Sequence, residues 1–130
     1  MLKSKTGTFH APSLGKELPN MRLWAVDLWI SNRPILTDQD LLRSVMYEAA
    51  HCGGVTVLGE KFCVFDNGAV TGVLVLAQSH LSIHTWPEFS MANVDLLSYG
   101  RLHGSEVMKH IARRLDARRV IIKSMLRAVR

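Results

Sequence analysis

The chain has 130 residues, of which 48% are hydrophobic and 21% are charged, and it carries a formal net charge of +5 at pH 7. This size suits one domain with a single core, and the composition argues against global disorder. The longest apolar run, 69–77, is far shorter than the roughly 20 residues of a membrane helix, and no apolar leader follows the first lysines. We therefore expect a cytoplasmic protein without a membrane segment.

The cysteines and the basic residues indicate little special chemistry. Cys52 and Cys63 form no CxxC pair and are too few for a disulfide scaffold, so we expect free thiols. No helix-turn-helix, zinc-finger or RNP-like strand accompanies the positive charge, so we expect no nucleic-acid partner. Nucleic-acid binding stays as the least favoured alternative, and a steep salt dependence of affinity would reveal it. Much of the charge lies late in the chain, at Lys109, Arg113, Arg114, Arg118, Arg119, Lys123, Arg127 and Arg130.

The first half of the chain predicts an arm, a strand and a helix. Residues 1–20 hold two prolines and two glycines with little periodicity, which is typical of a flexible arm ahead of a single domain at 21–130. The run 22–30 predicts a strand that contains one acid, Asp27. Thr37 is then predicted to cap a helix whose apolar residues recur at helical spacing up to Ala49.

The second half of the chain predicts mainly strands. Short strands are expected at 55–58 and 62–65, a longer one at 70–77, and further strands at 92–98 and 120–122. A second helix is expected at about 104–115. The order is β-α-β-β-β-β-α-β with short connections. It predicts an α+β fold, a mainly antiparallel sheet with two helices packed on one face.

The stretch 72–88 breaks the pattern of a core strand. An apolar run at 73–76 is followed by Gln78 and Ser79, and a period-2 alternation then continues with Ser82 and His84 on its polar side. Such conflicts with local rules tend to mark functional sites. Ser79 lacks the context of a nucleophile elbow, and two strand histidines four positions apart lie about 13 Å from each other, too far to chelate one metal. The residues alone therefore indicate a polar site and no metal site.

The run Q-S-H-L-S-I-H-T-W-P-E at 78–88 resembles the signature of the prokaryotic S-adenosylmethionine decarboxylases, small pyruvoyl enzymes of polyamine (spermidine) synthesis. The likeness extends through V-T-G-V-L-V-L before it and A-N-V-D-L after it, and covers roughly 22–123. It implies a self-processing zymogen. Ser79 attacks the preceding carbonyl, an N-to-O acyl shift gives an ester, and β-elimination cuts the chain between Gln78 and Ser79.

The resemblance also implies a cofactor and an assembly. A pyruvoyl group made from Ser79 would form a Schiff base with the substrate amine and act as the electron sink of the decarboxylation. The assembly would be a homodimer of αβ protomers. By position, the resemblance assigns Thr71 and His84 to processing and Glu88 to substrate binding, while Asp27 joins the site. Phe65, Trp86 and Phe89 are candidates to stack on an adenine, or else lie in the core.

Four positions depart from the pattern of that family. Gln78 stands where glutamate is usual, and Tyr99 stands where the family has the cysteine expected to donate a proton to the product carbanion. A phenol has an ordinary pKa near ~10 and a thiol near ~8.5, so Tyr99 is a weaker and larger proton donor. Leu23 replaces a histidine, and Trp29 replaces a small residue.

These departures leave three functions open. S-adenosylmethionine is the expected substrate, because the motif is intact through Glu88. Relatives that lose the usual substrate-site residues decarboxylate arginine or ornithine, which need an acidic anchor such as Asp27, Glu88 or Asp95. The third alternative is an uncleaved pseudoenzyme that acts as a binding partner.

Overall fold

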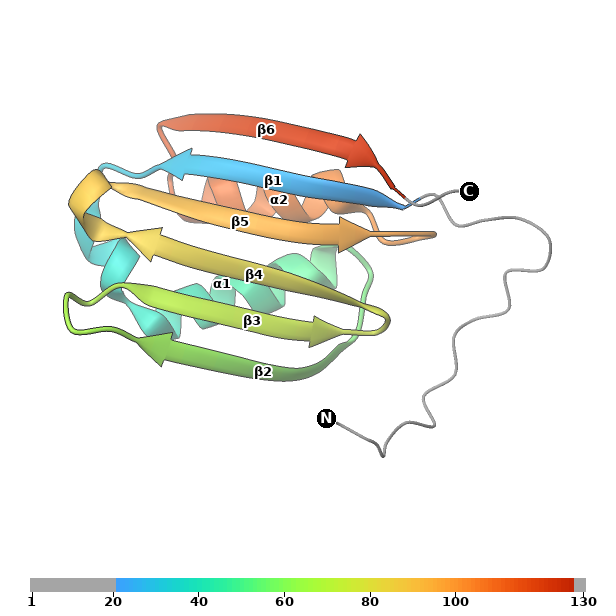
Figure 1. The fold of residues 1–130 in the computed structure, drawn as a ribbon, viewed down its shortest axis with the longest axis horizontal. Helices are drawn as coiled ribbons and strands as arrows, with labels where there is room; N and C mark the ends of the chain where they lie inside the picture. The colour runs from blue at the N-terminus through green and yellow to red at the C-terminus, as the bar shows by residue number, and fades with distance from the viewer. Residues whose placement is uncertain (1–20, 128–130) are drawn as a thin grey trace.

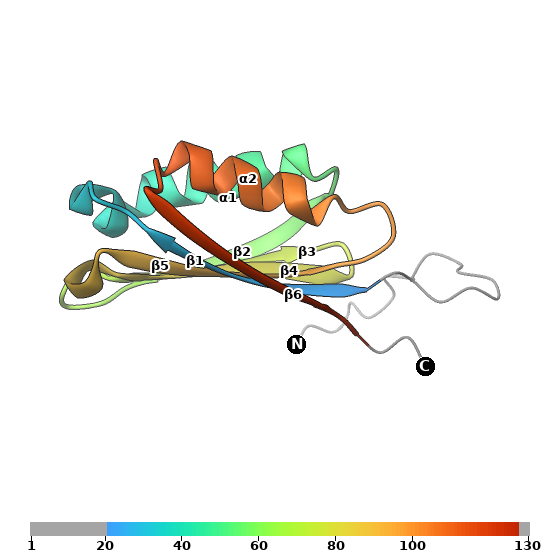
Figure 2. The same ribbon diagram turned by 90° about the horizontal axis from the view of Figure 1, so that it is seen from above.

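The computed structural model describes residues 21–127, so the predicted arm at 1–20 lies outside the described residues. Six strands form one antiparallel sheet in the order β2-β3-β4-β5-β1-β6, and two helices cover one of its faces (Figures 1 and 2). This confirms the predicted α+β fold. The elements are β1 (Arg22–Trp29), α1 (Gln39–Cys52), β2 (Val57–Val64), β3 (Val70–Leu76), β4 (Ser79–Trp86), β5 (Met91–Ser98), α2 (Gly104–Arg114) and β6 (Arg119–Leu126), with short 3-10 turns at Arg33–Thr37 and Pro87–Phe89.

The core lies between the sheet and the two helices (Figure 2). In the central strands every second residue is buried, so Leu74, Leu81 and Leu96 face the helices and are inaccessible to solvent. Leu42, Met46 and Ile111 pack against them from α1 and α2. Burial of a large apolar side chain contributes about 1.5–3 kcal/mol, so this layer fixes which face of each strand points inward.

The sheet face opposite the helices carries a row of polar side chains, one from each of four adjacent strands. The register pairs Thr71 on β3 with His84 on β4, and His84 with Asn93 on β5. Asn93 in turn pairs with Asp27 on β1. Because paired residues in an antiparallel sheet point to the same face, these four side chains lie side by side across the sheet.

Four details of the sequence prediction are wrong. The expected strands at 55–58 and 62–65 are parts of one strand, β2, which has a bulge between Val57 and Gly59 instead of a turn. The cap of α1 is Asp38, whose Oδ1 accepts a hydrogen bond from Leu41 N at 3.0 Å, and not Thr37. The last strand extends to Leu126. The stretch 72–88 is a hairpin of two strands, β3 and β4, and not one strand continued.

Within residues 21–127, neither helix is long and apolar enough to cross a membrane.

Candidate active site

A tight turn joins β3 to β4 at the position of the predicted cut. Leu76 pairs with Ser79, so Ala77 and Gln78 alone make the connection. Gln78 has a φ of 64°, in the left-handed region that non-glycine residues seldom adopt. A residue held there costs on the order of 1–3 kcal/mol and persists only where its surroundings fix it. The peptide bond before Ser79 is therefore held in a strained part of the backbone.

Ser79 is the first residue of β4, and its hydroxyl donates a hydrogen bond to the backbone carbonyl of Leu97 on β5. Its pairing with Leu76 and the strand alternation place it on the same face as Leu81 and Ile83, the face that the helices cover. The nucleophile predicted from the sequence is thus partly buried at the end of the sheet and held by a neighbouring strand.

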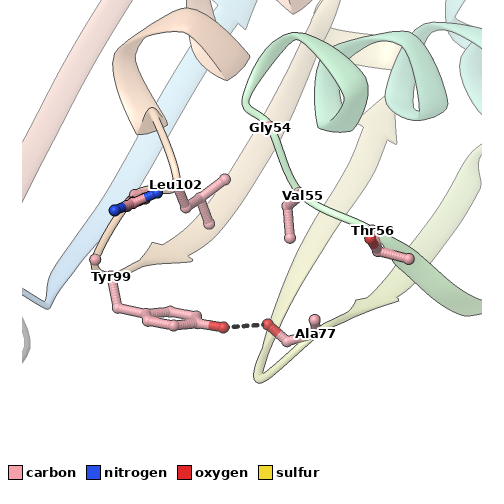
Figure 3. Close-up of a pocket in the computed structure, with 8 residues that line it drawn as sticks. Gly54, Val55, Thr56, Ala77, Tyr99 and Leu102 are labelled. Carbon is pink, nitrogen blue, oxygen red and sulfur yellow. Dashed lines mark hydrogen bonds between the residues drawn. The ribbon is translucent and has the colours of Figure 1, made fainter. Parts of the chain in front are cut away.

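Tyr99 contacts both residues of the turn. It follows the last residue of β5, and its hydroxyl lies 2.5 Å from the Ala77 carbonyl oxygen and 3.0 Å from the Gln78 Oε1 (Figure 3). Burial raises the pKa of the Tyr99 phenol above its ordinary value of 10.0, so the group is a protonated hydrogen-bond donor at neutral pH. The residue that replaces the family cysteine is therefore attached to the turn that would be cut.

A cavity of about 440 Å³ lies beside the turn (Figure 3). The loop after α1, the β3–β4 turn and the loop after β5 form its walls. Most of the lining is apolar, and of the lining residues only Arg101 is charged. The lining consists of Gly54, Val55, Thr56, Ala77, Tyr99, Gly100, Arg101 and Leu102.

On the other face, Thr71 and His84 form a hydrogen-bonded pair across β3 and β4. The Thr71 Oγ1 lies 2.5 Å from the His84 Nδ1. The His84 ring also meets the edges of two aromatic rings, that of Trp86 at 4.4 Å and that of Phe65 at 6.1 Å between centroids. The imidazole is therefore fixed on three sides.

A second cavity, of about 300 Å³, opens beside this imidazole, and its wall includes Phe65, His84, Trp86 and Glu88. The structure thus brings together four of the residues singled out in the sequence. Asp27 is linked to them through Asn93, which accepts from the Trp86 Nε1 at 2.6 Å and donates to Asp27 Oδ1 at 2.8 Å. Glu88 Oε1 lies 3.4 Å from the Asn67 Nδ2.

Asn93 is the site residue that the sequence analysis missed. Its signal was positional, since it stands opposite His84 in the register, and pairing of β4 with β5 cannot be read from composition alone. Among residues 21–127, no group of three or more His, Cys, Asp or Glu side chains is arranged to hold a metal ion.

Within one chain the two parts of the site are separate. Ser79 and His84 are five positions apart on β4, which corresponds to about 16 Å at ~3.3 Å per residue. An odd spacing on a strand also places the two side chains on opposite faces. One chain therefore does not bring its own His84 to its own Ser79.

Solved structures and relatives agree with this architecture. The crystal structure of the adenosylmethionine decarboxylase from Aquifex aeolicus superposes with a TM-score of 0.78 at 25% identity, over 85% of this chain and 92% of that one. The fold is thus that of an adenosylmethionine decarboxylase. The family model described as S-adenosylmethionine decarboxylase matches residues 22–128, and the chain belongs to this family.

Three curated relatives carry the name S-adenosylmethionine decarboxylase proenzyme. The protein from Symbiobacterium thermophilum is 54% identical over 65 residues, which are 50% of this chain and 49% of the relative. The Pseudomonas aeruginosa protein is 38% identical over 71% of this chain and 58% of its own length. The Thermotoga maritima protein is 33% identical over 83% and 79%. The chain thus spans about half of the first of these relatives and somewhat more of the second.

Proposed function

We propose that this chain is the precursor of a pyruvoyl-dependent S-adenosylmethionine decarboxylase and that it cuts itself between Gln78 and Ser79. Membership of the family supports the decarboxylase activity. The observation that carries the cut is Ser79 as the first residue of a strand, directly after a left-handed glutamine in a two-residue turn. Release of that backbone strain would favour the reaction.

The cut needs no group beyond the chain and water. The Ser79 Oγ bonds to the Gln78 carbonyl carbon as the peptide C–N bond breaks, and the hydroxyl proton passes to the freed amine, which leaves an ester. Loss of the Ser79 Cα proton then expels the Gln78 carboxylate from Cβ and divides the chain. Addition of water to the dehydroalanine end, with loss of ammonia, leaves a pyruvoyl group at position 79.

The residues around Ser79 fit such a group. The position is partly buried, next to the Leu97 carbonyl and near the Tyr99 phenol. When formed, the group supplies a carbonyl that takes up the substrate amine and the electron pair left by carbon dioxide. Tyr99 would return a proton to the substrate carbon, because burial keeps its phenol protonated at neutral pH.

The cavity at His84 supports S-adenosylmethionine over a basic amino acid. Phe65 and Trp86 offer aromatic faces for an adenine, and Glu88 offers a carboxylate for ribose hydroxyls. A guanidinium or an ammonium would need an acidic anchor. Asp27 already accepts a hydrogen bond from Asn93, which makes it part of the support of Trp86 and not a free anchor.

A homodimer would unite the two parts of the site. Because Ser79 and His84 leave opposite faces of one sheet, both can act on the same bond only if they belong to different copies. We therefore place the Thr71–His84 pair and the aromatic cavity of one protomer against the Ser79 turn of its partner.

Intact mass spectrometry of the purified protein tests the proposal. We expect two chains, 1–78 and 79–130, the second with a pyruvoyl end, and release of carbon dioxide from S-adenosylmethionine but not from arginine or ornithine. Ser79→Ala should stay intact and inactive. An uncut wild-type chain after long incubation would instead support the pseudoenzyme, and turnover by Ser79→Ala would exclude the pyruvoyl group.

A further inference from the structure

The Tyr99 hydroxyl touches both residues of the turn that would be cut, and it does so before any cut has occurred. We propose that Tyr99 and Gln78 are a matched pair that holds this turn in the geometry for chain cleavage, so that Tyr99 is a positioning residue for the cut. This inference rests on the proposed self-processing function. It goes beyond that function, because it gives Tyr99 a role in the precursor and accounts for two unusual residues together.

The hydrogen-bond inventory explains the match. A phenol has one proton, and the Ala77 carbonyl can only accept, so this proton belongs to the 2.5 Å contact with Ala77. The contact with Gln78 is then satisfied only if Gln78 is the donor. An amide side chain can turn its NH2 group toward the phenol oxygen, since its two ends are nearly equivalent in shape. Glutamine at position 78 can therefore complete the pair.

A glutamate at position 78 would break the match. An ionised carboxylate has no proton to give, and it attracts the phenol proton more strongly than a neutral carbonyl does. The Tyr99 hydroxyl would then turn from Ala77 to the carboxylate, and the Ala77 carbonyl would lose its donor. Gln78 and Tyr99 thus fit each other, whereas glutamate and tyrosine would compete.

The same end of β5 holds both sides of the bond to be cut. The Leu97 carbonyl accepts from the Ser79 hydroxyl, and Tyr99, two residues further on, donates to the Ala77 carbonyl. The nucleophile and the peptide plane that precedes Gln78 are therefore fixed from one short segment. Such placement of reacting groups is a recognised source of rate enhancement.

The experiment follows the disappearance of the intact chain with time, by intact mass, after cell-free synthesis. Tyr99→Phe removes the phenol and keeps the ring, so we expect cleavage to slow roughly threefold to tenfold, the effect of one lost hydrogen bond. The factor should be the same from pH 6 to pH 9, because an oriented hydroxyl does not titrate there. Tyr47→Phe is the matched control, since Tyr47 bonds Glu60 on the far side of the fold and should leave the rate unchanged.

A double-mutant cycle separates pairing from a general loss of structure. Gln78→Glu should slow cleavage when Tyr99 is present and have little further effect when Tyr99 is phenylalanine. Additive effects in the cycle would overturn the matched pair, and a Tyr99→Phe rate equal to wild type would overturn the positioning role while the proposed function stands. A wild-type chain that never cuts would reject the proposed function itself. In that case, hydrogen exchange at 76–80 in Tyr99→Phe, unchanged from wild type, would also reject the hold on the turn.

Discussion

Ser79 and His84 lie on the same strand, but their side chains leave the sheet on opposite faces. This relationship predicts complementation between two defective chains. His84→Ala alone and Ser79→Ala alone should both stay intact. When the two are co-expressed, the His84→Ala chain should be cut in mixed dimers, which are roughly half of the dimers for random pairing.

Tags of different mass identify which chain has been cut. Only the chain that retains Ser79 can be divided, so any cut in the Ser79→Ala chain signals an artefact. If co-expression leaves the His84→Ala chain intact although mixed dimers form, His84 does not act across the interface.

Thr71 holds the imidazole of His84 through one hydrogen bond. Thr71→Val keeps the shape of the side chain and removes the hydroxyl, so we expect the cut to slow roughly threefold to tenfold. Thr71→Ser restores the hydroxyl and should recover most of the rate. Equal rates for the valine and serine variants would show that only the shape of Thr71 matters.

Asn93 supports Trp86 from below, with Asp27 behind it. Asn93→Ala should loosen the Trp86 ring and weaken substrate binding. We expect KM for S-adenosylmethionine to rise roughly threefold to tenfold with kcat little changed, which is the pattern of a lost ground-state contact. The rate of chain cleavage should not change. A lower kcat at constant KM would place Asn93 in the chemistry instead.

Glu48 links α1 to α2, because it binds Arg114 at 2.8 Å and His110 at 2.8 Å. The Arg114 guanidinium, and then the His110 ring, hold the pKa of Glu48 below its ordinary value of 4.5. A lowered pKa in the folded state stabilises the protein above that ordinary value, and this contribution is lost as the pH falls through the lowered pKa.

We therefore expect Glu48→Gln to lower the urea midpoint at pH 7 and the difference from wild type to shrink below pH 4. The measurement uses the Ser79→Ala background, so that a single chain unfolds. Glu106→Gln is the control, because Glu106 has only a distant exposed partner, Lys109 at 4.0 Å. A difference that stays constant with pH would contradict the electrostatic origin.

Gly72 leaves room for the ring of Phe62, its register partner on β2. A Cβ at Gly72 would lie 2.1 Å from the Phe62 Cε2, so the ring would have to move. Gly72→Ala should destabilise the fold by about 1–3 kcal/mol, as overpacking does. Gly59→Ala on β2 is the control, since a Cβ there would meet no atom within 4 Å. Equal urea midpoints for the two variants would contradict this contact.

Much of the fold was readable because strong local patterns agree with it. The apolar spacing in α1 and the alternation in β1 and β5 predicted elements that the structure contains. The errors arose where a local signal was ambiguous. Gly59 was interpreted as a break, but an edge strand accommodates it with a bulge. The tight turn at Ala77 and Gln78 has neither glycine nor proline, so no turn signal marked the end of β3.

The residues of the site were predicted by resemblance, but their arrangement was not. Phe65, His84, Trp86 and Glu88 meet in one cavity as expected of a binding site. The contact of Tyr99 with Ala77 joins residues 22 positions apart, and it depends on how β5 runs beside the β3–β4 hairpin. Such pairing between strands is set by the packed core and not by local sequence, so it needed the structure.

The strand order has a consequence for what a cut at position 78 would leave behind. β1, β2 and β3 would belong to one piece and β4, β5 and β6 to the other, yet β1 lies between β5 and β6 in the sheet (Figure 1). The pieces would interlace like the fingers of two hands, so neither can depart while the sheet exists. Refolding would then require an encounter between two separate molecules, and the recovery of denatured protein would depend on concentration. The uncut chain is thus the form in which the fold assembles most readily, and cutting makes the folded state difficult to rebuild once lost.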